Sequence, residues 1–211
     1  MADELVLYTN PRSRGRIARW MLEEVGQPYR TEVLDYGTTM KAPSYLAINP
    51  MGKVPALRHG DAVVTEAAAI CAYLADAFPQ AGLAPPPGDR LRASYYRWLF
   101  FAAGPIEAAV INNAMGFVVP PEREPTVGYG SFNRVMTVLE DAVSKSDYLV
   151  GGKFGAADVY VGSQIGFGLL FGRIEKRPAF EAYWNRLKAR PAYDRARQLD
   201  ELITPSQKAT S

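Results

Sequence analysis

The chain has 211 residues, of which 48% are hydrophobic and 22% charged, as is typical of a globular protein with one or two domains. Its 24 Lys and Arg residues nearly balance 22 Asp and Glu residues, and the net charge of +2 argues against nucleic-acid and membrane partners. One cysteine, Cys71, and one histidine, His59, exclude an internal disulfide and a Cys/His zinc site, so we expect no bound metal.

From this sequence we expect no targeting signal. The start carries no basic leader, and the apolar run 5–8 is too short for a signal peptide. No stretch approaches the ~20 apolar residues of a membrane span. We therefore expect a cytoplasmic location.

The first 80 residues predict a small α/β domain. Its expected elements are, in chain order, strand 5–8, helix 13–25, strand 29–34, a helical turn within 43–48, strands 54–57 and 62–65, and helix 67–78. In the first helix Ile17, Met21 and Val25 lie four residues apart, and Gly26 follows as a stop signal. A βαβ unit followed by a hairpin and a helix is a thioredoxin-like order.

A linker and an all-helical domain are predicted next. Residues 79–88 hold four prolines and two glycines, which cannot continue a helix or a strand. We therefore place the domains at 1–80 and 89–211, with the linker at 81–88. The helices expected after it are 89–115 with a kink at Gly104-Pro105, one beginning after Ser131, one at 156–170, one from Pro178 to Pro191, and one at 192–202.

Two segments resemble the glutathione S-transferase family. Residues 49–57, NPMGKVPAL, resemble the family's NPxGxVPxL segment. Residues 65–74, TEAAAICAYL, resemble its later ESxAIxxYL segment, in the same order and at the same spacing. Residues 8–16 resemble the family's active-site turn, and residues 155–158 resemble part of its helical domain.

The resemblance implies a thioredoxin-like domain of order βαβαββα and an all-α C-terminal domain that contributes the electrophile site. It implies a homodimeric glutathione transferase that conjugates small hydrophobic electrophiles, with glutathione as co-substrate and no further cofactor. A glutathione-dependent peroxidase and a non-catalytic ligand-binding or scaffold protein are the alternatives.

The glutathione-binding residues follow from the same resemblance. It implies a cis peptide before Pro55, which lets the backbone of Val54 pair with the cysteinyl part of glutathione. Glu66 and the backbone N–H of Ala67, where the family usually has a serine, would hold the γ-glutamyl end. Lys53 would pair with the glycyl carboxylate. As alternatives, Glu66 only complements a helix dipole and Lys53 is simply solvated.

Two hydroxyl groups compete for the thiol of glutathione. Ser13 stands at the predicted start of the first helix beside Arg12, Arg14 and Arg16, and it resembles the catalytic serine of several classes of the family. Tyr8 occupies the place of the catalytic tyrosine in other classes. A hydroxyl donor, a helix N-terminus and nearby cations all stabilise a thiolate. In a third reading Ser13 is only a helix cap.

Two features of the second domain complete the expectations. Tyr95, Trp98, Phe101 and Ile106 either line the electrophile site between the domains or form the bundle core. Asp158 is expected to be structural, as half of a capping box in which Gly155 replaces the hydroxyl residue.

Overall fold

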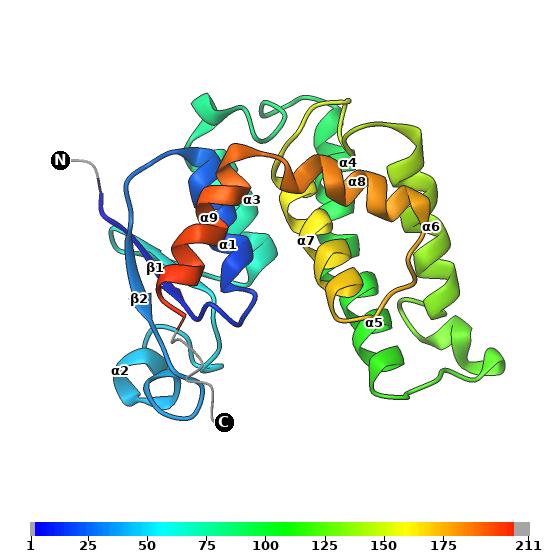
Figure 1. The fold of residues 1–211 in the computed structure, drawn as a ribbon, viewed down its shortest axis with the longest axis horizontal. Helices are drawn as coiled ribbons and strands as arrows, with labels where there is room; N and C mark the ends of the chain where they lie inside the picture. Colours follow the sequence, from blue (N-terminus) through cyan, green and yellow to red (C-terminus); the bar gives the residue numbers. More distant parts are fainter. Residues whose placement is uncertain (1–2, 205–211) are drawn as a thin grey trace, which may run out of the picture. The chain divides into compact units, whose positions relative to one another are not determined.

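Two compact units make up the computed structural model, which describes residues 3–204 (Figure 1). The first, here called the sheet unit, combines described residues of 1–81 and 190–211. The second, the helical unit, spans 82–189. The predicted combination of an α/β domain and an all-helical domain is confirmed.

The sheet unit is built on a four-stranded mixed sheet of order β2-β1-β3-β4. The strands are β1 (Leu5–Thr9), β2 (Arg30–Val33), β3 (Ala56–His59) and β4 (Ala62–Thr65). β1 pairs parallel with β2 and antiparallel with β3, and β3 pairs antiparallel with β4. All of β1 is buried, as expected for a central strand covered on both faces.

Two helices of the sheet unit pack against each other and against the sheet, α1 (Gly15–Val25) and α3 (Ala67–Ala77). The predicted stripe of Ile17, Met21 and Val25 is buried. α1 ends at Gly26, whose φ of 73° is left-handed and whose N–H donates to the carbonyl of Leu22. Both helices therefore begin and end close to where the sequence predicts them.

A short helical segment packs against Val6 and Tyr8, the residues of β1 that alternate with Leu5 and Leu7. It consists of a 3-10 turn at Thr39–Lys41 and α2 (Pro43–Leu46), and so agrees with the helical turn expected within 43–48. Met40 and Tyr45 supply its buried side chains, which contact Tyr8. This packing buries the ring of Tyr8.

The helical unit contains α4 (Leu91–Phe101), α5 (Glu107–Ala114), α6 (Phe132–Lys145), α7 (Ala156–Leu170) and α8 (Pro178–Lys188). A π-helical turn, Ala102–Ile106, joins α4 to α5 at the predicted kink. Pro105 lies in this turn and has no N–H to donate, so regular α-helical bonding is interrupted there. α7 is buried along most of its length.

The aromatic residues of α4 belong mainly to the core of the helical unit. Tyr95, Trp98 and Ile106 are buried, while Phe101 is half-buried. Of the two readings of these side chains, the structure supports a bundle core for the three buried ones.

The start of α7 is held by one buried carboxylate. Asp158 accepts hydrogen bonds from the N–H of Leu149 (2.9 Å), the N–H of Gly155 (3.0 Å) and the hydroxyl of Tyr183 (2.6 Å). A Cβ at Gly155 would lie 2.6 Å from the carbonyl oxygen of Leu83, which explains why a glycine stands where the family usually has a hydroxyl residue. Burial raises the pKa of Asp158 to about 6.

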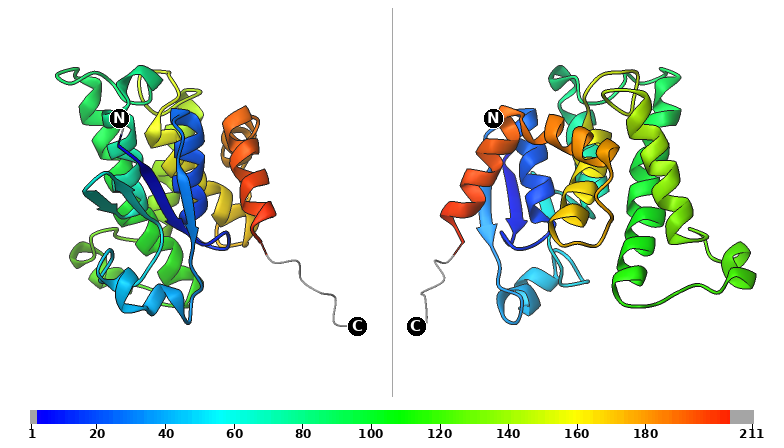
Figure 2. Two further views of the ribbon diagram at one scale, coloured as in Figure 1. Left: turned by 90° about the vertical axis from the view of Figure 1, so that its left-hand side faces the viewer. Right: turned by 45° about the vertical axis from the view of Figure 1, so that its right-hand side comes forward.

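The last helix, α9 (Pro191–Leu202), packs along α1 of the sheet unit (Figures 1 and 2). Arg190 donates to both carboxylate oxygens of Glu24, at 2.7 and 2.8 Å. The Nε of Arg19 lies 2.7 Å from Asp200, and both of these side chains are buried. The sequence predicts that all of 89–211 belongs to the helical domain, whereas the structure groups α9 with the sheet.

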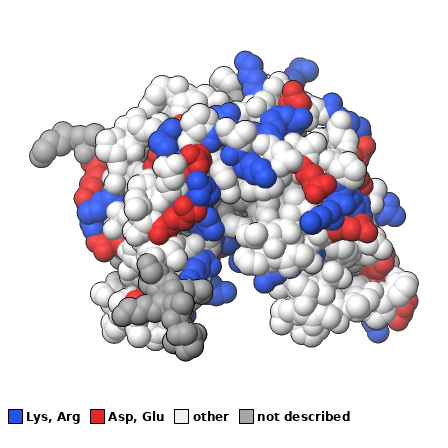
Figure 3. All heavy atoms as spheres, in the orientation of Figure 1, with Lys and Arg blue, Asp and Glu red and all other residues white. Residues whose placement is uncertain are grey.

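The surface carries charges of both signs, as the nearly balanced composition predicts. Lys and Arg are interspersed with Asp and Glu on the face that Figure 3 shows. Within residues 3–204, no helix has the length and the apolar character needed to cross a membrane.

Candidate active site

Strand register brings three chain segments to one end of the sheet. Tyr8 in β1 lies opposite Ala56 in β3, and Ala56 lies opposite Thr65 in β4. The turn that leaves β1, the peptide that enters β3 and the peptide that leaves β4 therefore meet at this end. They carry Ser13, Val54-Pro55 and Glu66-Ala67, so the residues expected to bind glutathione converge.

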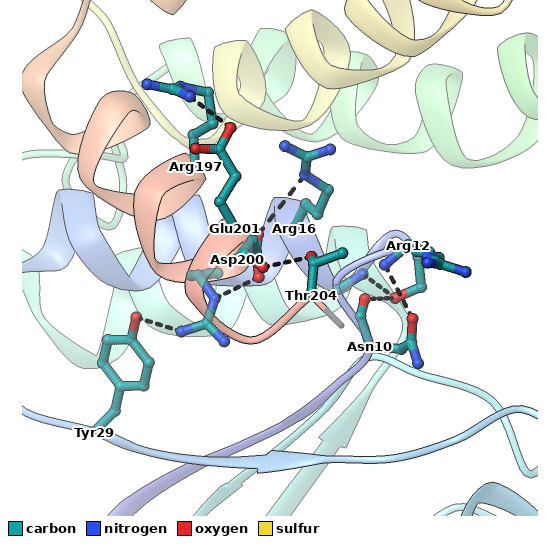
Figure 4. Close-up of polar contacts among 11 residues, drawn as sticks. Asn10, Arg12, Arg16, Tyr29, Arg197, Asp200, Glu201 and Thr204 are labelled. Atoms are coloured by element: carbon teal, nitrogen blue, oxygen red, sulfur yellow. Dashed lines mark hydrogen bonds and ion pairs between the residues drawn. The ribbon is translucent and has the colours of Figure 1, made fainter. Parts of the chain in front are cut away.

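Asn10 shapes the turn after β1. Its side-chain Nδ2 donates to the carbonyl of Leu34 at 2.8 Å. Its Oδ1 accepts the backbone N–H of Arg12 at 3.0 Å (Figure 4). Asn10 is buried. These two bonds tie the start of α1 to the end of β2.

The Ser13 hydroxyl makes two local hydrogen bonds. It donates to the carbonyl of Asn10 at 2.7 Å and accepts the N–H of Gly15 at 2.8 Å. The Asn10 carbonyl also accepts the backbone N–H of Ser13 at 3.0 Å. The hydroxyl proton can therefore turn toward a ligand without leaving that carbonyl unpaired. Ser13 is half-buried, so a ligand can reach it.

Tyr8, the rival hydroxyl, is only 8% exposed. Its ring lies 5.7 Å from that of Tyr45, centroid to centroid, in a cluster with Val6, Met40 and Ala56. The phenol is thus part of the packing between β1 and the α2 segment.

The peptide bond between Val54 and Pro55 is cis, as the family resemblance implies. The preceding carbonyl, that of Lys53, accepts hydrogen bonds from the Tyr45 hydroxyl (2.6 Å) and the Asn49 side chain (2.8 Å). In residues 3–204, the N–H and C=O of Val54 make no hydrogen bond, and no carboxylate pairs with the exposed Lys53. Both are therefore available to a ligand.

Glu66 lies at the start of α3 in an unusual backbone conformation. Its φ is 69° and its ψ 122°, and it is the one described residue other than glycine with a positive φ. Such a conformation costs about 1–3 kcal/mol and concentrates at functional sites. It leaves the carboxylate of Glu66 exposed, while Ala67 is buried as the first residue of α3.

Two Asn-Pro pairs shape the loops of the site, and the sequence analysis gives neither asparagine a role in it. The Oδ1 of Asn10 accepts the N–H of Arg12, and that of Asn49 accepts the N–H of Met51 at 3.1 Å. In each case the side-chain nitrogen reaches a carbonyl further along the chain. An Asn before a Pro is a signal for this side-chain turn and could have identified both residues.

Lys41, in the 3-10 turn before α2, contacts the same loop. Its Nζ donates to the carbonyl of Gly52 at 2.7 Å and so supports the loop before β3. Within the described ranges, no group of three or more His, Cys, Asp or Glu side chains could hold a metal ion.

Comparisons with known proteins agree over most of the chain. Residues 13–77 match the model of the glutathione S-transferase N-terminal domain, and residues 107–191 match that of the C-terminal domain. The probable glutathione S-transferase GSTF2 of Oryza sativa subsp. japonica is 30% identical over 85% of this chain and 88% of its own.

Solved structures give the same picture. A glutathione transferase from Methylococcus capsulatus is 32% identical with a TM-score of 0.78, covering 94% of this chain and all of its own. The glutathione transferase URE2P6 from Phanerochaete chrysosporium, solved in complex with oxidized glutathione, is 29% identical with a TM-score of 0.78. That match covers 96% of this chain and 98% of the other.

Proposed function

The chain belongs to the glutathione S-transferase family and is a glutathione transferase; we propose that Ser13 activates the glutathione thiol for attack on small hydrophobic electrophiles. The observation that carries this proposal is the strand register, which gathers a hydroxyl, an unpaired backbone edge and a helix start at one end of the sheet.

Glutathione has three parts, and the site offers a partner to each. The free N–H and C=O of Val54 suit the cysteinyl backbone, in the manner of an added β-strand. The exposed carboxylate of Glu66 suits the γ-glutamyl ammonium, and the Ala67 amide at the start of α3 suits its carboxylate. The exposed ammonium of Lys53 suits the glycyl carboxylate. The URE2P6 structure, which holds oxidized glutathione, supports a ligand of this kind for the fold.

Ser13 supplies the chemistry. A free thiol has a pKa of about 8.5 and is mostly protonated at neutral pH. In the proposed complex the Ser13 proton turns from the Asn10 carbonyl to the sulfur, while the carbonyl keeps the Ser13 N–H. The Gly15 N–H remains on the serine oxygen and polarises its O–H bond further. The bound thiol is thereby more acidic than the free one.

In the transfer step the thiol proton leaves to solvent and the thiolate attacks an electron-poor carbon. A carbon–sulfur bond forms, and the bond from that carbon to its leaving group breaks. With a chloro-nitroaromatic, chloride departs with the bonding electron pair.

The buried position of Tyr8 supports Ser13 over Tyr8 as the partner of the sulfur. The Tyr8 ring is committed to packing on Tyr45, whereas the Ser13 hydroxyl is partly open and its bond to Asn10 is replaceable. Tyr8 remains the rival assignment that experiment must test.

The proposal is tested by retention on immobilised glutathione and by conjugation of 1-chloro-2,4-dinitrobenzene. We expect the parent protein to bind and to turn over. We expect Ser13→Ala to bind equally well and to react about 10- to 100-fold more slowly, which corresponds to one hydrogen bond to an anion. A parent protein that is retained but forms no conjugate would make this a binding protein instead.

We also propose that the protein acts as a homodimer in the cytoplasm. Phe100 is 74% exposed on α4, and the exposed Tyr96 lies one turn before it, which supports an apolar contact with a second copy. Light scattering should give about twice the 23.2 kDa mass of one chain, whereas a single-chain mass at micromolar concentration would refute the dimer.

A further inference from the structure

Three arginines lie within three residues of Ser13 in the sequence, and their side chains differ in what they contact. The Nε of Arg16 lies 3.7 Å from Asp200, which is also paired with Arg19 at 2.7 Å. Arg14 is engaged in an interaction of its own. Arg12 is exposed, and in residues 3–204 its guanidinium pairs with no carboxylate. A bare positive charge thus stands next to the proposed thiol partner.

The backbone of Arg12 is held on both sides, which presents its side chain outward. Its N–H donates to Asn10 Oδ1 at 3.0 Å, and its carbonyl accepts the hydroxyl of Tyr36 at 3.3 Å. The side chain extends from the turn on the side away from Asp200 (Figure 4).

The acidic residues of α9 are already engaged with other arginines. Arg197 contacts Asp194 at 2.8 Å and also pairs with Glu201, while Asp200 takes Arg19 and Arg16 (Figure 4). No acid of this helix is left to neutralise Arg12. The guanidinium of Arg12 therefore keeps an uncompensated positive charge, which an anionic group of a ligand can neutralise.

We propose that the natural electrophile carries a carboxylate, which Arg12 binds while the sulfur of glutathione lies beside Ser13. This inference rests on the proposed function. Any electrophile that reacts must reach that sulfur. Arg12 directly precedes Ser13, and consecutive Cα atoms are about 3.8 Å apart, so both side chains leave the same turn beside the reacting atoms. A guanidinium also matches a carboxylate with two parallel hydrogen bonds.

Glutathione does not require Arg12 for its own carboxylates. The Ala67 amide and Lys53 serve them in the proposed complex. Arg12 is thus a specificity-determining residue, selecting for an acidic group on an otherwise apolar electrophile.

A matched pair of electrophiles tests the inference: 4-chloro-3,5-dinitrobenzoate and 4-chloro-3,5-dinitrobenzamide. They differ in one charge, and taking the variant-to-parent ratio for each substrate cancels their different intrinsic reactivity. We expect Arg12→Gln to lower kcat/KM for the benzoate about 5- to 30-fold more than for the benzamide. For the parent enzyme, added salt should lower kcat/KM for the benzoate relative to kcat/KM for the benzamide.

Two variants serve as controls. Arg12→Lys keeps the charge and should retain most of the preference for the benzoate. Arg58 lies on β3 opposite Val6, toward the other end of β1 in the same unit. Arg58→Gln also removes one positive charge and should leave the preference for the benzoate unchanged.

Three results would decide otherwise. Equal losses for both substrates in Arg12→Gln would overturn the inference and leave the transferase intact. A rise confined to the KM for glutathione would assign Arg12 to that ligand and also overturn it. If the parent conjugates neither substrate nor 1-chloro-2,4-dinitrobenzene, the proposed function itself fails, and the inference falls with it.

Discussion

The starts of α1 and α7 use polar side chains in similar ways, yet only one of them is open to a ligand. At α7, Asp158 is fully buried and accepts three hydrogen bonds, and its three donors have no other acceptor among the described residues. At α1, Ser13 is half-buried and donates to a carbonyl that already has a second donor. A capping group whose bonds are all needed is structural, whereas one with a replaceable bond can act on a ligand.

The largest effect that we expect is a loss of stability when the carboxylate at the start of α7 is removed. Asp158→Ala leaves two N–H groups and the Tyr183 hydroxyl without an acceptor, so we expect it to lower the free energy of unfolding by about 3–5 kcal/mol. Denaturant titration measures this. Tyr183→Phe removes one of the three donors and should cost about 1 kcal/mol. A loss below 1 kcal/mol in Asp158→Ala would mean that this cap is dispensable.

The pH dependence of stability tests the same carboxylate. Its pKa is raised to about 6 by burial, from 3.8, so the folded chain binds this proton more tightly than the unfolded chain. The stabilisation is present below about pH 4 and is lost as the pH rises through 6. Between pH 4 and 7, the parent should lose about 2 kcal/mol relative to Asp158→Asn. Parallel stability curves for the two proteins would contradict the raised pKa.

Placing a hydroxyl residue at the start of α7 should destabilise the fold. Gly155→Ser places a Cβ 2.6 Å from the Leu83 carbonyl, and we expect a loss of about 1–3 kcal/mol in thermal or denaturant unfolding. Gly104→Ala is the matched control, because a Cβ there meets no atom within 4 Å. A stabilised Gly155→Ser would show that the backbone of Leu83 yields easily.

Glu66, at the start of α3, affects both the stability of the fold and the proposed binding of glutathione. The change in stability that we expect from its substitution is the smallest of these predictions. Glu66→Gly relieves the positive φ and should stabilise the fold by about 1 kcal/mol, whereas Glu66→Ala should not. Both remove the carboxylate and should raise the KM for glutathione to a similar, large extent. If neither variant changes that KM, Glu66 is only an acid at a helix start.

Much of the sheet unit could be predicted from local patterns. The four-residue spacing of Ile17, Met21 and Val25 predicts the buried face of α1, and Gly26 predicts its end. The motif at 49–57 implies the cis peptide before Pro55. These features depend on neighbouring residues or on a family pattern, so the sequence carries them directly.

The remaining features depend on distant partners. Arg19 and Asp200 are 181 residues apart, and nothing in either segment indicates that they pair in a buried position. For this reason the sequence alone places α9 in the helical domain. The choice between Ser13 and Tyr8 also depends on a distant partner, because the Tyr8 ring packs on Tyr45, which lies far along the chain.

The central claim is that the hydroxyl at the start of α1, and not the buried phenol of β1, activates the thiol. The direct measurement is the thiolate absorbance of the enzyme–glutathione complex, titrated against pH in the parent, Ser13→Ala and Tyr8→Phe. A hydrogen bond to an anion is worth about 1.5–3 kcal/mol, so Ser13→Ala should raise the pKa of the bound thiol by about one to two units. Tyr8→Phe should leave it unchanged. A shift in Tyr8→Phe without one in Ser13→Ala would contradict the account and make this a tyrosine-type enzyme.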